Sequence, residues 1–197
     1  MTAPPGRRER KKAATRQKIA DTALALFLER GYDAVGIRDV AAEADVAVTT
    51  VFSHFASKEA LVFEQDENFE QRLTHAVTGR SANEPLIPAL RHEIHAMVRH
   101  CAAEGAAPLW HLIDRTPALR EYEDSMRLRH AESLAAAIAA ELDQPPNSTE
   151  CRAIARFVID AYSLARETAD PQAAVDEIFR MIEAAWAVTG RSDACRS

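Results

Sequence analysis

Residues 15–61, TRQKIADTALALFLERGYDAVGIRDVAAEADVAVTTVFSHFASKEAL, decide the fold of this chain. Apolar residues recur at helical spacing over residues 19–27, and Gly31 follows where a helix can end in a left-handed residue. After a second short helical segment, Asp45 supplies a tight turn before a third short helix over residues 47–54. Two short helices joined by such a turn can place the second one in the major groove of DNA, so this stretch predicts a helix-turn-helix.

Local signals predict where these helices begin and which side chains they bury. Gly36 is an acceptable N-cap for the second helix, and Asp39 puts a carboxylate at its third position. Ser57 can cap a fourth helix, which we expect over residues 58–78. The expected inward-facing residues are Ile19, Ala23, Leu26 and Phe27, then Ile37, Val40, Ala41 and Ala44, and finally Val51 and Phe55.

The rest of the chain also has helical periodicity, and no segment has a strand period that we would trust, so the predicted fold class is all-α. A break at residues 79–85 precedes a helix that carries Leu90, Ile94 and Met97 on one face. A long helix is expected over residues 117–142. The expected N-caps of the last three helices are Thr116, Ser148 or Thr149, and Asp170.

The charge of the chain is unevenly distributed. The net charge is −6, but residues 1–20 hold seven basic residues and one acidic residue, a local charge of +6. The other residues therefore carry −12. A basic arm beside an acidic body suits local contact with phosphates, whereas the alternative is a solvated, disordered tail.

Composition indicates a folded protein of a reducing compartment. Apolar residues make up 47% of the sequence, and its three cysteines show no spacing typical of a disulfide framework or a zinc site. The basic N-terminus is not followed by an apolar core, so it does not match a signal peptide. The longest uncharged apolar run, residues 135–140, is too short to cross a bilayer. We expect a cytoplasmic protein that does not contact a membrane.

The stretch 15–61 resembles the TetR family of transcriptional regulators. The residues that carry the resemblance are Thr15-Arg16, Ala23, Phe27, Gly31-Tyr32, Asp39-Val40-Ala41, Ala44, Val46, Thr50-Val51-Phe52, His54-Phe55, Ser57-Lys58-Glu59 and Leu61. It implies a homodimer with a four-helix interface, an internal ligand pocket, and repression that a small molecule relieves. The run TVFSHFASKEALVF, with Thr116-Pro117-Ala118-Leu119 further on, is also similar to a subgroup with a mycofactocin-regulator-like C-terminal domain.

Together, pattern and resemblance predict four regions: a flexible basic arm (1–14), a helix-turn-helix DNA-binding domain (15–57), a helical ligand-binding and dimerisation domain (58–190) and a flexible tail (191–197). The last two helices each carry a broad apolar stripe. Such a stripe fits a helix-on-helix dimer seam, or alternatively the core of one protomer.

The resemblance assigns DNA contacts to the outward positions of the third helix and to nearby cations. Lys58 matches a phosphate-contacting lysine of the family, and Phe52 stands at its usual tyrosine. Without the phenolic oxygen, Phe52 cannot donate that hydrogen bond to phosphate. Val35, Gly36, Asp45, Ala47 and Thr49 also depart from the family pattern. The predicted DNA-binding residues are Arg16, Arg38, Val48, Thr49, Thr50, Phe52, Ser53, His54 and Lys58.

Residues 48–54 include no Arg, Lys, Asn or Gln, so direct readout of bases looks sparse. Phosphate contacts and the arm are expected to carry much of the affinity, which makes binding strongly dependent on salt. The chain's partner is expected to be a double-stranded palindromic operator.

The resemblance places a ligand pocket in the C-terminal domain, and its lining would favour a mainly apolar effector. The alternative is that these side chains are ordinary core. His92, His95 and His100 are close together on one helix, and the neighbours His92 and His95 could share a metal. We interpret the three as a solvated face plus one buried histidine, and predict no metal and no cofactor. The candidate lining residues are Phe63, Met97, Cys101, Trp110, Met126, Phe157 and Tyr162.

The resulting hypothesis is a ligand-responsive, dimeric helix-turn-helix repressor. One alternative is a helix-turn-helix activator or partner-controlled regulator without a small-molecule effector. A helical-bundle enzyme is the remote alternative, since the sequence has no Gly-x-Ser-x-Gly, no Gly-x-Gly-x-x-Gly and no convincing set of metal ligands. The operator, the regulated genes, the effector and the sign of regulation stay open.

Overall fold

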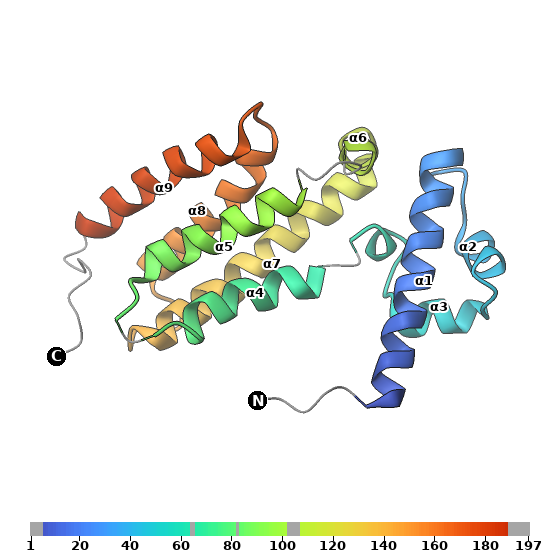
Figure 1. The fold of residues 1–197 in the computed structure, drawn as a ribbon, viewed down its shortest axis with the longest axis horizontal. Coiled ribbons are helices and arrows are strands. Elements are labelled where there is room, and N and C mark those ends of the chain that lie inside the picture. Colours follow the sequence, from blue (N-terminus) through green and yellow to red (C-terminus); the bar gives the residue numbers. More distant parts are fainter. Residues whose placement is uncertain (1–5, 64–65, 82, 102–106, 189–197) are drawn as a thin grey trace. The chain divides into compact units, whose positions relative to one another are not determined.

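The computed structural model describes residues 6–63, 66–81, 83–101 and 107–188. Within these ranges, every regular element is helical, which confirms the predicted all-α fold (Figure 1). The elements are α1 (Arg7–Arg30), α2 (Ile37–Glu43), α3 (Val48–His54), the 3-10 turn η1 (Glu59–Leu61), α4 (Asp66–Thr78), α5 (Leu86–Cys101), α6 (Ala107–Arg115), α7 (Pro117–Glu141), α8 (Thr149–Arg166) and α9 (Pro171–Val188).

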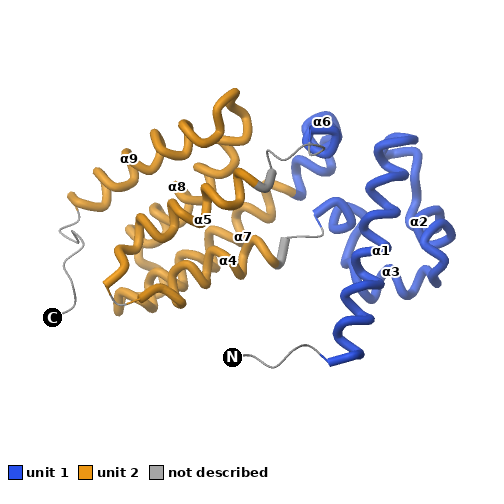
Figure 2. Tube along the Cα trace, viewed as in Figure 1, with its two compact units in different colours: residues 1–65, 107–122 blue, residues 66–106, 123–197 orange. Residues whose placement is uncertain are grey.

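The chain divides into two compact units (Figure 2). Unit 1 contains residues 1–65 and 107–122, and unit 2 contains residues 66–106 and 123–197. A single boundary between residues 57 and 58 was expected, but α6 and the first turns of α7 belong to unit 1. The reason is burial, because Ile113 and Leu119 are fully enclosed in the core of unit 1.

The core of unit 1 is built from the faces that the sequence pattern predicts. Ile19, Ala23, Leu26 and Phe27 of α1 are buried, and so are Val40, Ala41 and Ala44 of the α2 region. Val51 and Phe55 are buried as expected, whereas Ile37 is only partly buried at the edge of this core.

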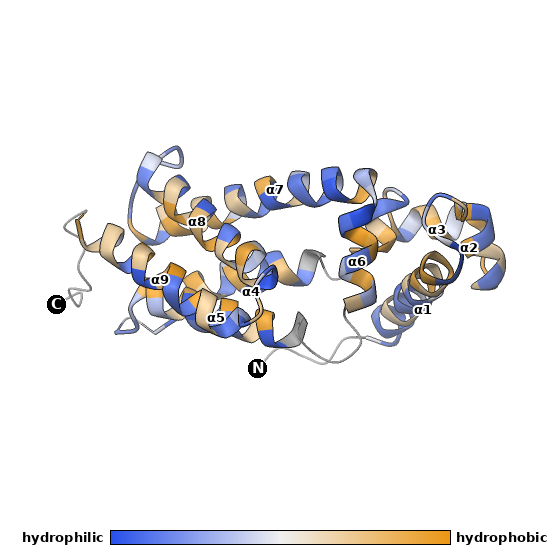
Figure 3. Cartoon of the chain, turned by 90° about the horizontal axis from the view of Figure 1, so that it is seen from above, coloured by the Kyte–Doolittle hydropathy of each residue, from blue (hydrophilic) through white to orange (hydrophobic). Residues whose placement is uncertain are grey.

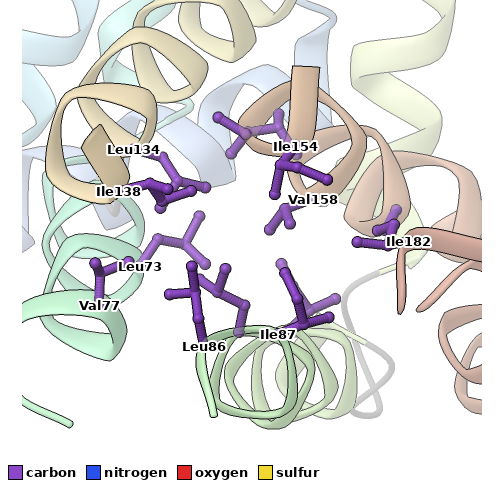
Figure 4. Close-up of a cluster of buried hydrophobic side chains, with 14 of the residues drawn as sticks. Leu73, Val77, Leu86, Ile87, Leu134, Ile138, Ile154, Val158 and Ile182 are labelled. Atoms are coloured by element: carbon purple, nitrogen blue, oxygen red, sulfur yellow. The ribbon is translucent and has the colours of Figure 1, made fainter. Parts of the chain in front are cut away.

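The core of unit 2 lies between longer helices. In Figure 4, Leu73 of α4, Ile87 of α5, Leu134 of α7 and Val158 of α8 point toward a common centre. α9 packs on α5 and α8 and adds Ile182 to this core. Figure 3 shows hydrophobic and hydrophilic residues on different sides of these helices, as expected for amphipathic helices that cover one core.

The prediction of a flexible arm is wrong from Arg7 onward, because α1 begins there and residues 7–14 are helical. Gly6 is the N-cap, and its carbonyl accepts the Arg10 N–H at 3.0 Å. Arg, Lys, Glu and Ala are strong helix formers, and no Gly or Pro interrupts residues 7–14. Residues 1–5 lie outside the described part of the chain.

The fourth helix does not begin at Lys58 as predicted. Ser57 does accept a backbone hydrogen bond, from the Ala60 N–H at 3.3 Å, but it opens only the short turn η1. Leu61 and Val62 are buried against the unit 1 core, which holds this segment to unit 1, and α4 starts later, at Asp66.

Two of the predicted helix caps are confirmed by side-chain hydrogen bonds, and Thr116 holds the position before Pro117 without capping through its hydroxyl. The Ser148 hydroxyl accepts from the Cys151 N–H at 3.4 Å, and Asp170 accepts from the Ala173 N–H at 3.1 Å. The Thr116 hydroxyl instead donates to the Leu112 carbonyl at 2.7 Å, so it bonds to the last turn of α6. The predicted tail at 191–197 lies outside the described residues. Among the helices that are described, none combines the length and hydropathy needed to span a bilayer.

Candidate nucleic-acid interface

The turn between α2 and α3 is fixed by backbone geometry and one carboxylate. The Asp39 carboxylate accepts the Gly36 N–H at 2.7 Å and so holds the start of α2. Asp45 lies in the left-handed region, with φ of 53°. The following Val46 N–H then donates to the Ala41 carbonyl at 2.9 Å, which closes the turn. Together these contacts set the direction in which α3 leaves the turn.

α3 has one buried face and one exposed face. Val51 is 1% exposed, whereas the adjacent Phe52 is 55% exposed. Thr49 and Ser53 lie on the exposed side, and Val48 and Thr50 are partly buried. Of the positions expected to face outward, Thr49 and Ser53 are exposed, and Phe52 adds a third exposed side chain on this helix of seven residues. This is the face that α3 can present to a groove.

Arg16 of α1 holds the C-terminal end of α3. Its guanidinium donates a hydrogen bond to the carbonyl oxygen of His54, the last residue of α3. The same group lies 4.4 Å from the centre of the Phe55 ring, in a cation–π arrangement. Arg16 was predicted to contact DNA, and these contacts give it a positioning role within unit 1.

Lys58 is anchored in a similar way. Its ammonium donates to the Tyr32 carbonyl at 2.6 Å and lies 4.0 Å from the centre of the Tyr32 ring. Burial lowers the pKa of Lys58, while the charges of Asp33 and Glu59 act in the opposite direction. The contacts tie η1 to the turn after α1, and the phosphate contact implied by the resemblance stays a prediction.

Tyr32 completes this anchor. Its hydroxyl donates to the Glu59 carboxylate at 2.8 Å, and its ring lies 5.1 Å from that of Phe27. Burial is the largest cause of the raised pKa of Tyr32, followed by the hydrogen bond to Glu59. The hydroxyl is therefore protonated at neutral pH and remains a donor.

His54 lies in a positively charged environment. Its Nδ1 is buried and has no hydrogen-bond partner among the described residues. Burial lowers the pKa of His54, and the charges of Lys12 and then Arg16 lower it further. The ring is therefore neutral at neutral pH. Lys12 was not predicted as a site residue, although it precedes Arg16 by one helical turn, a spacing that could have identified it.

Comparisons with known proteins agree with this geometry. The family described as "Bacterial regulatory proteins, tetR family" matches residues 19–64. The transcriptional regulator TcmR of Streptomyces glaucescens is 32% identical over 151 residues, covering 71% of this chain and 67% of TcmR. A transcriptional repressor of Mycobacterium tuberculosis is 32% identical over 143 residues, covering 71% of this chain and 75% of the repressor.

The chain belongs to the TetR family. It is a transcriptional regulator and not an enzyme, since its relatives are named as transcriptional regulators and repressors. Solved TetR-family structures share the fold. The SmeT–triclosan complex has a TM-score of 0.61 at 20% identity, covering 87% of this chain and 91% of SmeT. A TetR-family regulator of Streptomyces coelicolor has a TM-score of 0.56 at 24% identity, covering 90% of this chain and 98% of that one.

The predicted ligand-pocket residues of this TetR-family chain are divided between the two units. Phe63 and Trp110 belong to unit 1, where Phe63 stacks on Tyr122 with ring centres 5.4 Å apart. Met97 and Met126 are buried in unit 2. The side chain of Cys101 lies outside the described residues. Membership of the lining, and the similarity to a mycofactocin-regulator-like domain, stay predictions.

Within unit 2, Tyr162 is part of an aromatic cluster that the sequence pattern missed. The Phe69 ring lies 4.8 Å from Tyr162 in an edge contact and 5.0 Å from His130 in a stacked one. His130 is buried, and helical spacing alone gave no reason to single it out. Phe157 lies away from such a cluster, since 52% of it is exposed on α8.

His92 and His95 of α5 differ in their exposure and in their contacts. His95 contacts the Gln172 side chain through Nδ1 at 2.6 Å and Asp176 through Nε2 at 2.7 Å, whereas His92 is exposed. Among the described residues, no group of three or more His, Cys, Asp or Glu side chains could hold a metal ion. His95 thus links α5 to α9.

Proposed function

We propose that this TetR-family chain is a homodimeric repressor that binds a palindromic operator through α3 and leaves it when a mainly apolar small molecule binds. The observation that carries the proposal is the exposed face of α3 around Thr49, Phe52 and Ser53. The opposite face of this helix packs into the core of unit 1 through Val51. Such a helix can enter the major groove while α2 supports it.

The chemistry of this face favours contacts to thymine methyl groups and phosphates. Val48, Thr49 and Thr50 offer methyl groups, and the Thr hydroxyls can donate to phosphates or bond base edges. The Ser53 hydroxyl already donates to the Thr50 carbonyl at 2.7 Å, which leaves its lone pairs as acceptors. Arg38 is exposed on α2 and can contact a phosphate.

A dimer is supported by large apolar side chains that are exposed on the last two helices. Phe157 and Leu164 of α8 are 52% and 50% exposed and are seven residues apart. Met181 and Val188 of α9 are 66% and 87% exposed and have the same spacing. The helices α8 and α9 can therefore pack against α8 and α9 of a second copy and form a four-helix seam. Phe157 then belongs to this seam and not to a pocket wall.

A ligand inside unit 2 is supported by the chemistry of its interior. Met97 and Met126 are adaptable apolar groups, and the Phe69–Tyr162–His130 cluster adds aromatic surface. The structural neighbour SmeT is named in complex with triclosan. A mainly apolar effector suits these side chains.

The experiment that tests this function is selection of bound sequences from a random duplex pool at moderate salt. The expected result is an enriched inverted repeat with half-sites about 34–36 Å apart, one turn of duplex. A pool that stays random, or an enriched site without two-fold symmetry, contradicts the proposal. A thermal-shift screen then finds ligands, because a molecule that binds the folded state raises Tm, and each hit is tested for operator release.

The dimer seam is tested separately with one matched pair of variants. Phe157→Glu should give a monomer in sedimentation analysis, because it places a charge in the proposed seam. Leu128→Glu is the control, since Leu128 is equally exposed, at 56%, but lies on α7. A dimer that survives Phe157→Glu excludes this seam.

A further inference from the structure

Two of the three cations predicted to contact DNA, Arg16 and Lys58, make contacts inside unit 1, whereas Arg38 is exposed on α2. The Arg16 guanidinium bonds the His54 carbonyl and covers the Phe55 ring, and the Lys58 ammonium bonds the Tyr32 carbonyl. A group that is held this way loses part of its reach toward a phosphate. With only Arg38 left exposed among the three, the strong salt dependence expected for this chain points to further cations near α3.

The helical start of α1 supplies such cations. Arg8, Lys12 and Arg16 follow one another at four-residue spacing, so they lie within about 80° of one another on the helix surface. Arg16 lies at the inner end, under the C-terminal end of α3. The three cations form a column along α1, in which Arg8 and Lys12 are exposed and lie toward the N-terminus from Arg16. Because α1 is helical from Arg7, the column has a fixed direction that a flexible arm would lack.

Lys12 lies one helical turn before Arg16, whose guanidinium bonds the last residue of α3. The charges of Lys12 and Arg16 also lower the pKa of that residue, His54, after the larger effect of burial. The positive charge of this part of α1 therefore acts at the C-terminal end of α3. When a helix occupies a major groove, backbone phosphates flank it, so a cation beside its end is well placed to meet one.

We propose that Lys12, with Arg8 one turn before it, forms a binding site for a DNA-backbone phosphate beside the C-terminal end of α3. This site rests on the proposed function, since it assumes that α3 enters the groove. Charge complementarity identifies the occupant. Residues 1–20 carry +6 and the rest of the chain −12, so a polyanion is attracted to this segment and repelled by the remaining surface.

The test compares two lysines of the same helix. Lys12→Gln removes a cation of the column, and Lys18→Gln removes an equally exposed one that lies about 120° around the helix from Lys12. Affinity for the selected operator and for an unrelated duplex of the same length is measured between 50 and 200 mM salt, about a fourfold range. Circular dichroism checks that both variants keep the helicity of the wild type.

Loss of one phosphate contact in each protomer should reduce the slope of log affinity against log salt by about 2 for a dimer. Over a fourfold rise in salt, the wild type then loses about tenfold more affinity than Lys12→Gln. Lys18→Gln should keep the wild-type slope, and Arg8→Gln added to Lys12→Gln should reduce it further. Equal slopes for the wild type and Lys12→Gln overturn the site, as does an equal reduction by Lys18→Gln.

The unrelated duplex separates this outcome from failure of the proposed function. If no operator is enriched but Lys12→Gln still lowers the slope on the unrelated duplex, the phosphate site stands and the sequence-specific repressor does not. If an operator is enriched and Lys12→Gln leaves its slope unchanged, the repressor stands and the phosphate site fails.

Discussion

The two units use their long cationic side chains differently. In unit 1, Arg16 and Lys58 donate to backbone carbonyls and lie on aromatic rings. In unit 2, five arginines pair with carboxylates that lie far from them in the sequence. These pairs are Arg72–Glu93, Arg80–Glu141, Arg91–Asp176, Arg127–Asp160 and Arg166–Glu123.

Helix length explains the difference. α2 and α3 have seven residues each, too few to be stable alone, so their ends need anchors from other elements. The helices of unit 2 have 13–25 residues and are held along their lengths by apolar stripes. Ion pairs there join helices that already pack together. Anchors should therefore matter for the orientation of α3, and ion pairs for the stability of unit 2.

The chain carries a reporter for each unit. It has two tryptophans, Trp110 in unit 1 and Trp186 in unit 2. In a Trp186→Phe background, fluorescence reports unit 1, and in a Trp110→Phe background it reports unit 2. Urea unfolding followed in both backgrounds can assign each loss of stability to one unit.

The largest effect is expected from the Arg166–Glu123 pair of unit 2, whose side chains are only 14% and 17% exposed. Arg166→Met should lower the free energy of unfolding by about 3 kcal/mol, because it leaves Glu123 with an unpaired, mostly buried charge. Adding Glu123→Gln should recover part of the loss. A loss seen by Trp110 and not by Trp186 would contradict the assignment to unit 2.

Arg16→Met should cost about 2 kcal/mol in unit 1, because it removes a charged hydrogen bond to the end of α3. Operator affinity should fall more than stability explains, since α3 loses its C-terminal anchor. Arg16→Lys keeps the charge but not the planar group over Phe55, and should recover only part of the affinity. Full recovery by lysine would mean that charge alone matters.

Lys58→Met should cost about 1.5 kcal/mol in unit 1 through loss of the bond to the Tyr32 carbonyl. If Lys58 is mainly an anchor, the salt slope of operator binding stays at the wild-type value. A slope that falls by about 2 for the dimer would instead assign a phosphate contact to Lys58, as the family resemblance implies.

The smallest expected effect is that of acid, which should lower the stability of unit 1 at a higher pH than that of unit 2. The pKa of His54 is lowered in the folded state, so the unfolded chain binds the proton more readily, and stability falls as pH drops below about 6.5. In unit 2, Arg91 and then His95 lower the pKa of Asp176, so its contribution is lost only below about pH 4. The urea midpoints at pH 7.5 and pH 5.5 should therefore differ less in His54→Gln than in the wild type.

Features set by neighbouring residues were predictable from the sequence. The buried face of α1, the Asp45 turn and the Ser148 and Asp170 caps each depend on residues a few positions apart. The start of α4 could not be predicted in this way, because the segment before it is held by contacts from Lys58 and Glu59 to Tyr32, which is 26 and 27 residues away. Periodicity identifies an apolar face and does not identify what covers it, so the membership of α6 in unit 1 was missed.

The candidate site was predictable in part for the same reason. Of the positions expected to face outward on α3, Thr49 and Ser53 are exposed, whereas Val48, Thr50 and His54 are only partly exposed because a helix of seven residues packs on its neighbours at both ends. The internal contacts of Arg16 and Lys58 do not follow from it, because a cation's partner depends on tertiary structure. The aromatic cluster at Phe69 brings together α4, α7 and α8, which no local pattern connects.

Unit 1 is built from two separate stretches of the chain, so it cannot be moved into another protein as one continuous segment. A segment cut after Gln65 would carry α1, α2, α3 and η1 but lack Ile113 and Leu119, both fully buried in the same core. A chimera that transplants the DNA-reading unit into another regulator must therefore bring residues 107–122 with it. Since α7 runs from this segment into unit 2 without a break, recombination at a single crossover cannot exchange one unit and leave the other intact.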